Sequence, residues 1–131
     1  MNRENIRSYH TAAAPEAIGP YSQAVSVAGM LYTSGQTGLD PATGALASGG
    51  FEGQAEQVFA NLGQVLESAG ASFSDVVKAT VYLTDMADFP VLNRIYARVF
   101  GDHRPARSTV QAAALPKGGV VEIDLVARLP G

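Results

Sequence analysis

The chain has 131 residues, of which 47% are hydrophobic and 16% are charged, and its formal net charge is −3. This length and composition are typical of one globular domain with a hydrophobic core of its own. The nine basic residues are dispersed along the chain, which argues against a protein that grips the phosphate backbone of nucleic acids.

The absence of cysteine excludes disulfides, thiolate chemistry and cysteine-ligated metals, and it is consistent with a reducing compartment. Residues 1–5 are polar and are not followed by the apolar run of a secretory signal. No apolar run approaches the length needed to span a membrane. We therefore expect a single cytoplasmic domain over residues 1–131, with neither a membrane nor a nucleic acid as its partner.

The first half of the chain predicts a hairpin and a long helix. Residues 24–28 and 31–34 resemble two short strands joined at Gly29. A loop rich in glycine and proline follows, and Phe51 then opens a stripe of apolar residues with helical spacing. Gly70 stands where a helix of this length needs a C-terminal cap.

The second half predicts a strand, a helix and two further strands. Residues 76–83 are rich in β-branched side chains. Asp88 is a candidate N-cap for a second helix, in which Pro90 is tolerated in the first turn. Two segments, 105–110 and 121–127, then alternate polar and apolar residues with the period of a half-buried strand.

This order of elements favours an α+β fold in which both helices cover one face of a mixed sheet. The opposite face would then expose a set of large apolar side chains, which a monomer rarely leaves in water. We therefore expect a homo-oligomer that buries this helix-free face between subunits. The side chains predicted to lie on it are Met30, Tyr32, Val76, Tyr82 and Val126.

Arg107 and Glu122 stand opposite the apolar positions of the last two predicted strands. If Val110 and Ala112 face the core, both charged residues emerge together on the helix-free face. The guanidinium group is suited to bind a carboxylate through two parallel hydrogen bonds, and the glutamate to hold a water. The residues alone give no reason to prefer Glu122 to Asp124, and they leave open an ordinary ion-pairing role for Arg107.

Three groups of motifs resemble the RidA (YjgF) family of reactive-intermediate deaminases. They are AIGPYSQA at residues 17–24, TSGQ at residues 33–36, and the C-terminal series PARS at 105–108, LPK at 115–117 and VEI at 121–123. Their order and spacing extend the resemblance over nearly the whole chain. It implies a chorismate-mutase-like α+β fold of about six strands with two helices on one face, assembled as a homotrimer with sites between subunits.

The resemblance also implies a chemistry, which is the hydrolysis of 2-enamino and 2-imino acids such as 2-aminoacrylate and 2-iminopropanoate to 2-keto acids and ammonia, without a cofactor. Arg107 matches the residue that binds the substrate carboxylate, and Glu122 matches the one that positions the water. The positions that match pocket-lining residues are Tyr21, Ser34, Gly35 and Asn93.

Thr109 departs from the family pattern, because many members carry cysteine at this position. The resemblance assigns the backbone of this residue to the substrate pocket, so deamination should survive the difference. His10 and His103 have no metal-binding motif around them, and we expect no metal site.

Three alternative functions stay open. The first is a deaminase for another substrate, such as an aminomuconate-like intermediate. The second is a non-catalytic metabolite-binding or chaperone-like protein. The third is a ribonuclease or translation inhibitor, against which the dispersed basic residues argue.

Overall fold

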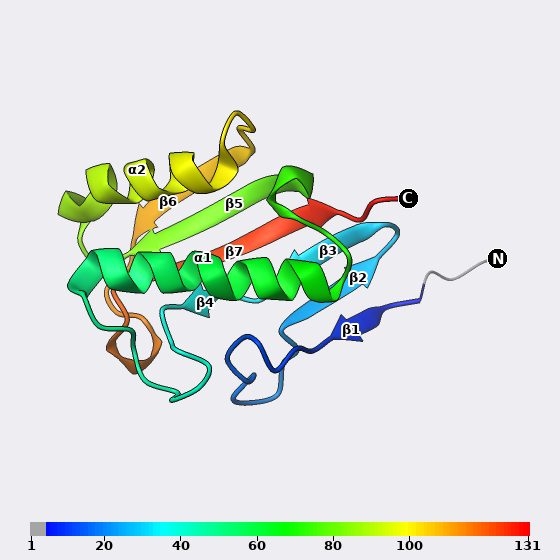
Figure 1. Ribbon diagram of the computed structural model, residues 1–131, viewed down its shortest axis with the longest axis horizontal. Helices are drawn as coiled ribbons and strands as arrows, with labels where there is room; N and C mark the ends of the chain where they lie inside the picture. Colours follow the sequence, from blue (N-terminus) through cyan, green and yellow to red (C-terminus); the bar gives the residue numbers. More distant parts are fainter. Residues whose placement is uncertain (1–4) are drawn as a thin grey trace.

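The fold is known from a computed structural model that describes residues 5–131. A mixed sheet of seven strands is covered on one face by two helices (Figure 1). The strands are β1 (Arg7–Tyr9), β2 (Ala24–Val27), β3 (Met30–Thr33), β4 (Gln36–Thr37), β5 (Val76–Leu83), β6 (Ala106–Gln111) and β7 (Val121–Arg128). The helices are α1 (Gly50–Ser68) and α2 (Phe89–Phe100). The α+β arrangement with both helices on one face is therefore as predicted.

The strand order across the sheet is β1-β2-β3-β7-β5-β6, and the short strand β4 pairs with β7 beside β3. Only β6 runs parallel to its neighbour, β5, while the other pairs are antiparallel. The hairpin β2–β3, the strand β5 and both helices lie where the sequence predicts them. Strands β1 and β4 were not predicted, because three and two residues are too short to show a period.

The helices begin and end through different local interactions. Gly70 adopts a φ of 78° just beyond α1, a conformation that glycine accepts without strain. Asp88 precedes α2 as predicted, but its side chain makes no capping hydrogen bond. Asp85 instead accepts a hydrogen bond of 2.9 Å from the backbone N–H of Ala87, which stabilises the turn before the helix.

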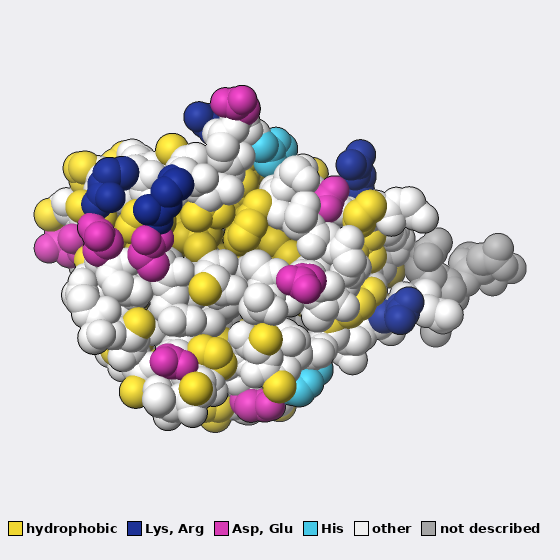
Figure 2. All heavy atoms as spheres, viewed as in Figure 1, with side chains coloured by type: hydrophobic (Ala, Val, Ile, Leu, Met, Phe, Trp, Pro, Cys, Tyr) yellow, Lys and Arg dark blue, Asp and Glu magenta, His cyan; other side chains and the backbone are white. Residues whose placement is uncertain are grey.

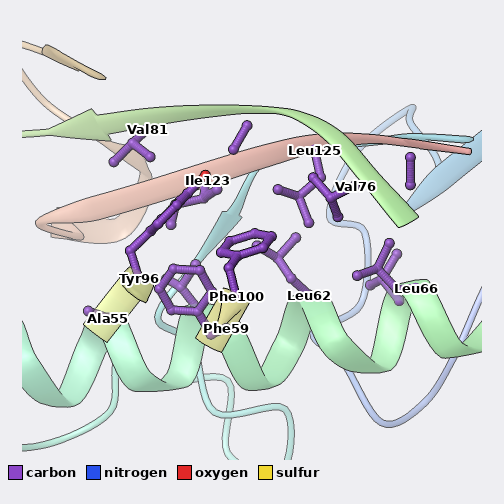
Figure 3. Packing of buried hydrophobic residues seen from close by; sticks show 14 of the residues in the cluster. Ala55, Phe59, Leu62, Leu66, Val76, Val81, Tyr96, Phe100, Ile123 and Leu125 are labelled. Atoms are coloured by element: carbon purple, nitrogen blue, oxygen red, sulfur yellow. The ribbon is translucent and has the colours of Figure 1, made fainter. Parts of the chain in front are cut away.

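The core lies between the helices and the sheet (Figure 3). Leu62 and Leu66 of α1 and Ile123 of β7 are completely buried. Phe59 of α1 meets Phe100 of α2 edge to face, with ring centres 6.4 Å apart. On the outer surface, basic side chains of α2 lie beside acidic side chains of α1, as in the Arg94–Glu52 pair at 2.7 Å (Figure 2).

The helix-free face carries most, but not all, of the predicted apolar set. Tyr32 pairs with Val126 on this face, and Tyr32 and Val110 are 43% and 45% exposed. The prediction for Val76 is wrong, because this residue is completely buried in the core. A register shift between Val76 and Lys78 inserts Val77 as an extra residue, which reverses the alternation at that point.

Within residues 5–131, neither helix has the length and hydropathy needed to cross a membrane.

Candidate active site

The residues predicted to form one site fall into two groups in this chain. Tyr21, Ser34, Gly35 and Glu122 line a cavity of about 400 Å³, which we call the glutamate pocket. Asn93 and Arg107 line a second hollow of about 430 Å³, which we call the arginine pocket. The two cavities share no lining residue. The predicted residues therefore lie in two separate cavities and do not form one site within a chain. We call the two cavities half-sites.

The prediction that Arg107 and Glu122 share the helix-free face is wrong. Arg107 pairs with Ala79 of β5, whose side chain belongs to the core on the helix side. Glu122 pairs with Tyr82 of β5, on the helix-free side. Because paired residues of neighbouring strands point to the same face, the two charged groups lie on opposite faces of the sheet. Strand β5 also separates their two strands.

The error arose in β6, which is the edge strand of the sheet. Its few apolar residues do not mark the core face. The pairing with β5 instead aligns Val110 with Tyr82 on the helix-free face and leaves Val110 45% exposed. Arg107 consequently points toward α2.

The glutamate pocket is shaped by a close contact between Gly35 and Glu122. A Cβ atom added to Gly35 would lie 2.1 Å from Oε2 of Glu122, so a larger residue there would displace this carboxylate. Burial raises the pKa of the Glu122 carboxyl, and the negative charge of Asp124 raises it further. Glu122 is therefore poised to exchange a proton closer to neutral pH than an exposed glutamate.

Ser34 and Tyr21 shape this pocket through local hydrogen bonds. The Ser34 hydroxyl donates to the carbonyl of Ser22 at 2.6 Å, and the Ser34 N–H donates to the carbonyl of Gln23 at 2.9 Å. The Tyr21 hydroxyl accepts a hydrogen bond of 3.3 Å from the backbone N–H of Ile18. Because Ser34 already donates its only proton to the backbone, it supports the wall of the pocket.

The arginine pocket holds a guanidinium group without an acidic partner among residues 5–131. The central carbon of the Arg107 guanidinium lies 4.7 Å from the ring centre of Tyr96 and 5.4 Å from that of Phe89. Arginine keeps its charge at any physiological pH, so this half-buried group is a ready site for an anion.

Thr109 lines neither cavity, although it lies two residues beyond Arg107 on the same face of β6. It pairs with Val81, a core residue, and its hydroxyl is buried without a hydrogen-bond partner. No group of three or more potential metal ligands is found within residues 5–131.

Sequence reasoning missed three buried amides that hold the walls of the glutamate pocket. The side chain of Gln23 is bonded to the N–H and carbonyl of Thr11 and to the carbonyl of Pro15. Asn61 donates to the carbonyls of Thr37 and Leu39. Gln54 accepts from the N–H of Val120 at 2.9 Å.

A signal for two of these amides exists in the sequence. Gln54 and Asn61 are seven residues apart and continue the buried face of α1, where apolar residues are the rule. A polar residue on such a face needs a hydrogen-bond partner, so its position predicts a contact with a neighbouring loop.

Comparison with known proteins gives matches that cover most of the chain. The family model described as endoribonuclease L-PSP matches residues 11–129. A human protein named 2-iminobutanoate/2-iminopropanoate deaminase is 51% identical over 121 residues, which are 92% of this chain and 88% of that protein. An Arabidopsis thaliana protein named Reactive Intermediate Deaminase A, chloroplastic, is 48% identical over 91% of this chain and 64% of its own length.

Solved structures agree with the fold. RidA from an Antarctic Psychrobacter species is 50% identical, with a TM-score of 0.91 over 94% of this chain and 99% of that one. E. coli TdcF, solved with bound serine, is 38% identical, with a TM-score of 0.89 over 95% of this chain and 99% of that one. The expectation of a chorismate-mutase-like α+β fold is thereby confirmed.

The buried amide of Gln23 offers a direct test of how the glutamate pocket is built. Gln23→Ala should lower the free energy of unfolding by about 1–3 kcal/mol, because it leaves backbone groups of the half-buried residues Thr11 and Pro15 without this partner. Amide hydrogen exchange should show lost protection at Thr11. Gln64→Ala, at an exposed position of α1, is the control and should change neither quantity. Unchanged protection of the Thr11 amide in Gln23→Ala would show that the Gln23 side chain does not hold this segment in place.

Proposed function

This chain belongs to the RidA (endoribonuclease L-PSP) family, and from that premise we propose that it hydrolyses reactive 2-imino acids and their 2-enamino tautomers to 2-keto acids and ammonia. The observation that carries the proposal is the Arg107 guanidinium, which is charged, half-buried and without an acidic partner among residues 5–131. The serine bound to the relative TdcF supports a ligand with a carboxylate next to a nitrogen-bearing carbon.

The reaction needs three tasks, and the two half-sites offer groups for each of them. Arg107 binds the substrate carboxylate through paired N–H donors. Glu122, in its ionised form, takes a proton from a water as its oxygen bonds to the imine carbon. Glu122 passes this proton to the imine nitrogen, which gives a carbinolamine. It then takes the proton of the carbinolamine hydroxyl and delivers it to the nitrogen as the C=O bond forms and the carbon–nitrogen bond breaks, so that both protons of the water leave with ammonia. Asn93 and the backbone at Gly35 complete the pocket, whereas Thr109 lines neither cavity.

We further propose that each active site combines the arginine pocket of one subunit with the glutamate pocket of a neighbour in a homotrimer. Two observations support this arrangement. In a single chain the two half-sites lie on opposite faces of the sheet. The helix-free face also exposes Tyr32 and Val110, which a partner subunit would cover.

Several relatives and the family description carry endoribonuclease or translation-inhibitor names. Two features favour the deaminase proposal. The net charge is −3, which opposes the approach of a polyanion. The arginine pocket is a small hollow with two basic side chains, Arg104 and Arg107, in place of the extended basic groove that tracks a nucleic-acid backbone.

The first test of the proposal follows the catalytic reaction itself. An amino-acid dehydratase would generate 2-aminoacrylate in the assay, and pyruvate release would be measured with and without the protein. Arg107→Ala should abolish the acceleration, because the carboxylate loses its partner. Arg94→Ala, which removes an exposed arginine of α2 paired with Glu52, should leave the rate unchanged. Full acceleration by Arg107→Ala would remove this residue from the site.

The pH dependence tests Glu122. Because the base acts in its ionised form, the catalysed rate should fall as the pH drops through the raised pKa of this carboxyl. Asp124→Asn removes the neighbouring charge that contributes to the raised pKa, so the acidic limb should move to lower pH. The rate must be corrected at each pH for hydrolysis without enzyme. If Asp124→Asn leaves the acidic limb of the pH–rate profile unchanged, Glu122 is not the titrating base.

Subunit mixing tests whether the half-sites come from different subunits. Arg107→Ala and Glu122→Gln should each be inactive as homotrimers, whereas co-refolded mixtures should regain activity. If every site takes one half from each of two neighbouring subunits, random mixing rebuilds about one quarter of the sites. Native mass spectrometry would verify the mixed trimers. Mixed trimers without recovered activity would show that one subunit supplies both groups.

A further inference from the structure

The aromatic residues of α2 next to Arg107 have a second role besides filling the core. We propose that Phe89 and Tyr96 are positioning residues that hold the Arg107 guanidinium through cation–π contacts, so that its N–H donors are kept for the carboxylate of the substrate. This inference rests on the proposed role of Arg107 as the carboxylate-binding residue.

The geometry places both rings within reach of the same cation. The guanidinium carbon is 4.7 Å from the ring centre of Tyr96 and 5.4 Å from that of Phe89, and both distances are inside the range of about 6 Å for an effective cation–π contact. Phe89, Asn93 and Tyr96 are spaced by four and three residues, so they lie on one face of α2. One helix face therefore supplies the rings and the polar neighbour of the arginine.

The choice of rings in place of a carboxylate has a functional consequence. A carboxylate beside Arg107 would accept the paired N–H donors and compete directly with an anionic substrate. An aromatic ring attracts the cation through its negative face and offers no lone pair to those donors. The aromatic pair thus restrains a long, flexible side chain and leaves its hydrogen-bonding edge available.

The Tyr96 ring, and not its hydroxyl, makes this contact. Tyr96 is only 7% exposed, and its hydroxyl is buried without a hydrogen-bond partner. Burial raises the pKa of this phenol, although Arg107 and Arg104 act in the opposite direction. The phenol is therefore neutral near pH 7. Tyr96→Phe keeps the ring and removes an unsatisfied polar group, so it should raise the dissociation constant for a 2-keto acid less than Tyr96→Leu, which removes the ring.

The decisive variant changes the electronic character of a ring and keeps its shape. Trifluorophenylalanine in place of Phe89, introduced by codon suppression, withdraws electron density from the ring face. We expect the dissociation constant for 2-oxobutanoate, the 2-keto acid product of 2-iminobutanoate, to rise about three- to tenfold by calorimetry. KM in the deaminase assay should rise in parallel, while kcat changes little. Phe89→Leu should likewise raise KM with little change in kcat. Arg94→Ala, at an exposed position of α2 outside the arginine pocket, should behave as the wild type.

The Arg107→Ala background separates this inference from the function on which it rests. There the fluorinated ring should have no further effect on 2-oxobutanoate binding, because the cation that it would hold is gone. Equal affinity of the fluorinated and wild-type proteins, both folded by thermal unfolding, would overturn the positioning role. Full activity of Arg107→Ala would instead overturn the carboxylate-binding role, whatever the rings do.

Discussion

The register of β5 against its two neighbours decides where both charged residues of the candidate site lie. Ala79 of β5 is paired with Arg107 on one side, and Tyr82 is paired with Glu122 on the other. The two positions differ by three along β5, which is an odd offset, so their partners must point to opposite faces of the sheet. A single chain consequently cannot direct both groups to one ligand, so the proposed site combines groups of two subunits. The proposal of a shared interface site follows from this register.

The buried polar residues show how the rest of the fold serves one half of the site. Burying an amide costs free energy unless its hydrogen bonds are made, and Gln23, Gln54 and Asn61 all make theirs with backbone groups of loops or short strands. Those segments carry residues of the glutamate pocket or lie next to it. The long helix α1 is therefore a scaffold for this pocket as well as a wall of the core.

The elements that the sequence predicts well are those with a long, regular period. The helix stripe from Phe51 and the alternation of β7 each depend on neighbours along the chain, which the sequence displays directly. Two local errors come from contacts between distant segments. The bulge at Val77 places Val76 in the core. The pairing of the edge strand β6 with β5 places Arg107 on the face of the sheet that α2 covers. Gln23 could not be assigned, because its partners are set by the path of residues 11–15.

The family resemblance predicts a role for Glu122 that physical reasoning from the sequence could not separate from that of Asp124. Nothing in the alternation of β7 distinguishes Glu122 from Asp124, since both lie on the same face. The structure supplies the physical difference. Asp124 accepts a hydrogen bond of 3.2 Å from the Tyr82 hydroxyl, whereas Glu122 lies against Gly35 at the wall of a cavity. A carboxylate that keeps its oxygens beside open space can hold a water and exchange a proton. One that is already bonded within the sheet is better suited to tune the charge of its neighbour.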